Sequence, residues 1–150
     1  MTSVSTTTTT GLRRKIGTLA ALAAAVVTGM TVSAAPASAG PNCAAGYHCV
    51  FYTGLNSARH SYFNSDANFT NDTFNQVSGG AGYGQNVNDN VESASNSSTG
   101  GYESHYYLNI NYNSFLFCVN PGSYVEYLPS GQANEASSLQ LTGTTSTHCY

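Results

Sequence analysis

The fold is constrained most by a series of short aromatic and β-branched runs, each ended by a turn. Residues 47–52 form one such run, and residues 59–63 offer it a hairpin partner across a turn at 55–58. Residues 106–112 alternate apolar and polar side chains, as expected of a half-buried strand, with a break at 113–114 before 115–119. Because no stretch carries a helical stripe longer than two turns, we predict an all-β sandwich or barrel.

Two polar stretches share one pattern. Residues 88–93 and residues 133–138 each place amide or carboxylate side chains ahead of hydroxyl side chains and a short apolar run. Asn and Asp close tight turns and tolerate a left-handed backbone. The repetition indicates a duplicated unit, although two unrelated polar turns would look alike at this length.

Residues 1–39 have the features of a cleaved secretory signal. A basic segment at 13–15 precedes an apolar stretch at 16–27, and Ala37-Ser38-Ala39 is a small-residue cleavage site. Polar residues interrupt the apolar stretch before it reaches the roughly 20 residues of a membrane anchor. We therefore expect a secreted, extracellular chain of residues 40–150 with no membrane attachment. The paired arginines leave both general and twin-arginine export open.

The charge of the mature chain excludes several partners. Residues 40–150 hold seven acidic residues against a single Arg59, a net charge of −6 with histidine neutral. Nucleic-acid binding depends on Lys and Arg contacts to phosphate, so a nucleic-acid partner is excluded. The same reasoning disfavours binding to an anionic membrane surface. Divalent cations or a basic protein remain as the partners that the negative charge favours.

The four cysteines predict two disulfides. A domain of about 110 residues buries a limited share of its surface, and secreted domains of this size are commonly cross-linked. Three pairings are possible. The proximity of Cys43 and Cys49 favours Cys43–Cys49 with Cys118–Cys149. The second bond closes a loop of about 30 residues, which corresponds to roughly 3–4 kcal/mol.

Catalytic machinery is hard to assemble from this sequence. The four histidines include no pair spaced for zinc on a helix, and no Gly-x-Ser-x-Gly elbow occurs. A cysteine nucleophile needs a free thiol, whereas all four are expected to be oxidised. We predict that the protein is not an enzyme.

Residues 43–52, with the sequence Cys-Ala-Ala-Gly-Tyr-His-Cys-Val-Phe-Tyr, resemble the start of the actinomycete secreted peptidase-inhibitor family. The resemblance continues at 55–59, at 88–96, at 117–119 and at 133–139. It implies a βγ-crystallin-like Greek-key sandwich with two motifs in one domain, each opening on an aromatic hairpin and carrying a serine-containing turn. It further implies a monomeric inhibitor whose partner is a secreted peptidase, a metallopeptidase first of all.

An inhibitory loop has one candidate segment. Residues 116–122 combine apolar side chains, a tethered Cys118 and a rigid turn, and a disulfide-braced loop loses little entropy on docking. Thermolysin-like peptidases favour an apolar residue after the scissile bond, a position that Val119 would fill. The same alternation also fits a core strand in which Phe117 and Val119 point inward.

Calcium is the one cofactor that the sequence supports. Asn88, Asp89, Asn90 and Glu92 supply amide and carboxylate oxygens within five residues, and the second turn adds Ser137. The crystallin-type calcium pattern has a hydroxyl where this chain has Glu92. The alternative for these residues is that Asp89 and Ser93 only brace the turn. The alternative to a peptidase inhibitor is a calcium-binding extracellular βγ-crystallin-type module without inhibitory activity. A third interpretation is a carbohydrate- or cell-wall-binding module, suggested by the eleven tyrosines and many amide side chains.

Overall fold

The structure is a computed structural model that describes residues 39–150. The predicted signal, residues 1–39, falls outside this range except for its last residue and stays a prediction. Within the range no helix is both long and apolar enough to cross a membrane. The elements are β1 (His48–Phe51), β2 (Arg59–Tyr62), the 3-10 helix η1 (Phe69–Asn71), β3 (Ser93–Asn96), β4 (Glu103–Asn109), β5 (Asn113–Val119), β6 (Tyr124–Val125) and β7 (Ser138–Thr142).

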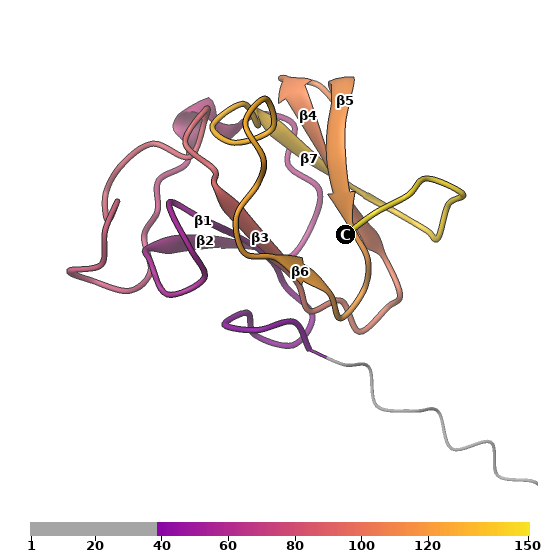
Figure 1. Cartoon of the computed structure of the whole chain (residues 1–150), viewed down its shortest axis with the longest axis horizontal. Helices are drawn as coiled ribbons and strands as arrows, with labels where there is room; N and C mark the ends of the chain where they lie inside the picture. Colours follow the sequence, from indigo (N-terminus) through magenta and orange to yellow (C-terminus); the bar gives the residue numbers. More distant parts are fainter. Residues whose placement is uncertain (1–38) are drawn as a thin grey trace, which may run out of the picture. The chain divides into compact units, whose positions relative to one another are not determined.

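Two antiparallel sheets exchange strands between the halves of the chain (Figure 1). The first sheet has the order β2-β1-β3-β6, so β6 of the second half pairs with β3 of the first. The second sheet has the order β5-β4-β7, and Asp66 of the first half bridges Leu139 of β7. Each half thus gives a hairpin and a third strand to its own sheet and a short segment to the other. The predicted all-β, βγ-crystallin-like sandwich of two Greek-key motifs is confirmed.

One apolar core joins both halves. Val50 of β1, Phe69 of η1, Tyr106 of β4 and Leu139 of β7 belong to one cluster and are 0% exposed. Tyr106 stacks on Phe117 of β5 with ring centroids 4.5 Å apart. Burial of apolar surface is the dominant favourable term in folding, so the two motifs stabilise each other.

The two hairpins follow the sequence closely but not completely. The β1–β2 pairing matches the prediction, with Phe51 opposite Arg59. In the β4–β5 hairpin the turn lies earlier than the expected break at 113–114. Asn111 and Tyr112 both have φ 59, the left-handed conformation of a tight hairpin turn, and Asn113 already belongs to β5.

The disulfides are those predicted. Cys43 is bonded to Cys49 and Cys118 to Cys149, which leaves no free cysteine. The first closes the segment in front of β1, and the second ties the end of β5 to the C-terminus. Each bond lies within one half of the duplicated chain.

Candidate functional site

The two polar turns lie against each other and exchange backbone hydrogen bonds. Asp89 N donates to the carbonyl of Ala136 at 3.1 Å, and Asn134 N donates to the carbonyl of Val91 at 2.8 Å. The two donor residues, Asp89 and Asn134, are 45 positions apart in the sequence, and so are the two acceptor residues, Val91 and Ala136. The contacts are therefore related by the duplication, which agrees with the repeat seen in the sequence.

The side chains repeat this exchange. Ser137 Oγ donates to Asp89 Oδ1 at 3.2 Å. Asn134 Nδ2 donates to Glu92 Oε1 at 3.1 Å. Asp89 and Asn134 are the second residues of their turns, and Glu92 and Ser137 are the fifth. The second residue of each turn therefore contacts the fifth residue of the other. Glu92 occupies in the first turn the position that Ser137 holds in the second. The predicted ligand set omitted Asn134, which only the repeat could have indicated.

Each of the two turns contains one residue with a left-handed backbone conformation. Asp89 has φ 57 and Asn134 has φ 60. Asn and Asp adopt this conformation at lower cost than other residues with a Cβ, because their short polar side chains bond locally. The residue types at these two positions therefore follow from the backbone and do not by themselves prove a ligand role.

The oxygens around the first turn fit a hard cation. Asn88 Oδ1 is buried and accepts no hydrogen bond from the protein, although its amide nitrogen donates to Asp89 Oδ2 at 2.6 Å. Asn90 Nδ2 is occupied by the carbonyl of Asn88 at 3.0 Å. Calcium takes carboxylate, amide and carbonyl oxygens in flexible numbers. Of the predicted ligands, Asn88, Asp89, Asn90 and Glu92 belong to the first turn, and Ser137 contacts Asp89 from the second. These are the residues that would hold the ion.

The structure contradicts the expectation that Cys118 and Val119 form an exposed loop. Val119 is 0% exposed and Cys118 is 1% exposed. Val119 packs in the main core, and its carbonyl accepts from Asn96 Nδ2 at 2.9 Å. A side chain buried in this way does not reach a peptidase subsite from the folded domain. The alternative interpretation fits the structure: Phe117 and Val119 are inward-facing residues of β5, and Cys118 forms a structural disulfide.

One histidine contact resembles a catalytic pair and one histidine cluster resembles a metal site, but both are buried. His48 Nδ1 lies 2.6 Å from Ser104 Oγ, yet Ser104 is 0% exposed and its hydroxyl does not reach a substrate. Burial lowers the pKa of His48 from 6.5 to about 4, so its ring is neutral. Within residues 39–150 the one cluster of three potential His, Cys, Asp or Glu metal ligands is His105, Cys118 and Cys149. Both of its sulfurs are held in the disulfide.

Glu103 instead fastens the C-terminal segment. Its carboxylate accepts from Thr145 N at 2.9 Å, from Thr145 Oγ1 at 2.8 Å and from His105 Nε2 at 2.7 Å. Burial alone would raise the pKa of Glu103, but these hydrogen bonds outweigh it and the pKa is lowered. This group therefore has a structural role.

Comparison with models of known protein families gives no match, and comparison with curated proteins gives none either. Two solved structures are similar to this chain. One, from work on the evolution of the eye lens βγ-crystallin domain fold, has 16% identity and a TM-score of 0.49 over 68% of this chain and 90% of its own. The other, the N-terminal domain of protein S, has 14% identity and a TM-score of 0.42 over 65% and 96%. Membership in the peptidase-inhibitor family stays a prediction.

Proposed function

We propose that the protein is a secreted calcium-binding module in which the ion is held where the two polar turns meet. The observation that carries this proposal is the reciprocal contact of Asp89 with Ser137 and of Glu92 with Asn134. It brings the carboxylates of Asp89 and Glu92 against the Ser137 hydroxyl and the Asn134 amide group of a turn 45 residues away. Such an oxygen set suits calcium better than zinc, which prefers His and Cys.

The ion would act as a clamp between the two halves. Asp89 belongs to the first turn and Ser137 to the second, so a cation bound to both opposes their separation. Calcium that binds only the folded chain raises stability by mass action, by about 2.7 kcal/mol at a free concentration one hundred times the dissociation constant. For a domain of this size that corresponds to a rise in Tm of roughly 10 °C or more.

The test is calorimetric titration of chelator-treated protein together with thermal unfolding with and without calcium. Asp89→Asn is the sharpest variant, because Asn keeps the left-handed backbone and can still accept from Ser137 while losing the charge. We expect it to lower calcium affinity at least tenfold and to leave the Tm of the calcium-free protein nearly unchanged. Glu135→Gln is the matched control, since Glu135 is exposed in the second turn and should not alter the affinity. Absence of both heat and a Tm rise at millimolar calcium would refute the proposal.

Inhibition of a secreted metallopeptidase is the second candidate, supported by the resemblance of residues 43–52 to the inhibitor family. Since Val119 is buried, the β4–β5 hairpin is a better contact. Its apolar side chains Leu108, Ile110 and Phe115 are 37%, 42% and 46% exposed. β5 is also an edge strand of its sheet. Peptide recognition often proceeds by pairing with such an edge.

A screen of the mature protein against metallo-, serine and cysteine peptidases tests this second function. If a target is found, Ile110→Asp should weaken inhibition without unfolding the domain, because the side chain is already partly in water. Inhibition that is unchanged by this substitution would place the contact elsewhere on the surface. No inhibition of any peptidase class would reject the function.

A further inference from the structure

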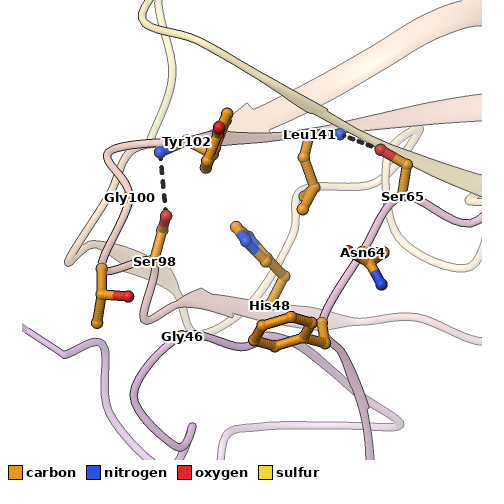
Figure 2. Close-up of a pocket in the computed structure, with 10 residues that line it drawn as sticks. Gly46, His48, Asn64, Ser65, Ser98, Gly100, Tyr102 and Leu141 are labelled. Atoms are coloured by element: carbon orange, nitrogen blue, oxygen red, sulfur yellow. Dashed lines mark hydrogen bonds between the residues drawn. The ribbon is translucent and has the colours of Figure 1, made fainter.

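A cavity of about 500 Å³ opens where the start of β1 approaches the end of β7 (Figure 2). Its walls also come from the segment after β2 and from the loop in front of β4. Phe63, Tyr102, His48, Asn64, Ser98 and Leu141 line it. This volume lies in the range of small-molecule sites, and the cavity is separate from the paired turns.

Two exposed aromatic rings border the cavity. Phe63 is 63% exposed and Tyr102 is 49% exposed. Exposed rings of this size leave apolar faces in water unless a ligand covers them. Figure 2 shows the His48 ring projecting toward Tyr102 and Leu141.

Both rings are held in position by the protein. The Phe63 ring meets the edge of Tyr47, with centroids 5.5 Å apart at 60°. The Tyr102 ring packs against Gly100, where a Cβ would come within 2.7 Å of a ring carbon. Tyr102 N donates to Ser98 Oγ at 3.0 Å. A ligand would therefore meet walls that need little ordering on binding.

The polar groups of the cavity are neutral and mixed in hydrogen-bonding character. None of its lining residues carries a carboxylate, ammonium or guanidinium group. His48 lines the cavity but is only 1% exposed, and its Nδ1 is engaged with Ser104. The exposed side chains of Asn64 and Thr99 add an amide and a hydroxyl.

We propose that this cavity binds a neutral oligosaccharide, with Phe63 and Tyr102 stacking on pyranose faces and the Asn64 amide and Thr99 hydroxyl bonding to sugar hydroxyls. A pyranose ring with equatorial substituents has apolar C–H faces and a rim of hydroxyls. Aromatic walls match the faces, and the uncharged donors and acceptors match the rim. Charged ligands would find no counter-charge here and would lose hydration.

Calorimetric titration of the mature protein with cellotriose and with triacetylchitotriose tests the proposal. We expect saturable binding of at least one trisaccharide at millimolar concentration or below. Tyr102→Ala and Phe63→Ala should each weaken it at least tenfold, whereas Tyr102→Phe keeps the ring and should stay within about threefold. Tyr127→Ala is the matched control, since Tyr127 is 67% exposed but lies outside the cavity. This substitution should leave the affinity for the trisaccharide unchanged.

A measurement on the unmodified protein keeps the test independent of how the variants fold. Amide shifts in nuclear magnetic resonance should move on sugar addition at Gly46, Ser98 and Gly100, which line the cavity. Failure of both trisaccharides to bind overturns the proposal. So does binding that both alanine variants retain, or shifts confined to other parts of the surface. Calcium-free protein should bind equally well, which separates this outcome from that of the calcium site.

Discussion

Truncation of Val119 tests the placement of β5 most directly. The side chain is 0% exposed and packs in the core shared by both halves. Val119→Ala removes two buried carbons, which costs about 1.6 kcal/mol in transfer free energy. Incomplete collapse of the resulting space adds a cavity contribution. We expect a total loss of about 2–3 kcal/mol, or roughly 10–20 °C in Tm for a domain of this size.

Urea denaturation followed by circular dichroism measures this loss, with the midpoint shifted and the slope unchanged. Val77→Ala is the matched control, because the same two carbons are removed from a side chain that is 41% exposed. Val77 also has φ 65, which is strained for a β-branched residue, so its replacement should be neutral or stabilising. If Val119→Ala leaves the midpoint where it is, the buried position of Val119 is refuted and an exposed loop returns to consideration.

Three other outcomes are expected. The contribution of His48 to stability should fall by about 3 kcal/mol between pH 7 and pH 4, because the unfolded chain protonates His48 near pH 6.5 while burial holds its folded pKa at about 4. His48→Gln should lack this component, and an identical pH profile would contradict it. Replacing Cys118 and Cys149 with Ser opens a loop spanning 31 positions and should cost about 3–4 kcal/mol in urea unfolding; a loss below about 1 kcal/mol would count against it. Asn134→Ala, at φ 60, should cost about 1–2 kcal/mol, and Asn134→Gly clearly less.

The sequence predicted runs that cover β1, β2, β4 and β5, but it did not predict β7 or β3. Ser93–Asn96 reads Ser-Ala-Ser-Asn, with little apolar character, yet all four residues are buried. β1 and β6 pair with it on both sides. Asn96 Nδ2 donates to the carbonyls of Tyr102 and Val119 at 2.8 and 2.9 Å. Burial of these polar groups depends on partners far along the chain, which a local pattern does not contain.

In the candidate sites, too, the sequence predicted some features and not others. Asp89 and Glu92 were visible as an oxygen-rich turn, but their contacts with Ser137 and Asn134 arise only when the halves meet. Val119 fitted a loop and a core strand equally well, because alternation does not say which face of a strand is covered. The aromatic cavity was not predicted, since its walls come from four separate segments.

The position of the disulfides has a consequence for the integrity of the domain. Cys43–Cys49 and Cys118–Cys149 each lie within one half, so the halves are joined covalently only by the backbone. The connection passes through Thr99, Gly100 and Gly101, which are exposed. A single proteolytic cut there would yield two fragments, each retaining its own cross-link and held together by exchanged strands and a common core. In energetic terms the domain is a heterodimer encoded in one chain. After such a cut, the fraction of fragments that stay associated and folded would depend on their concentration.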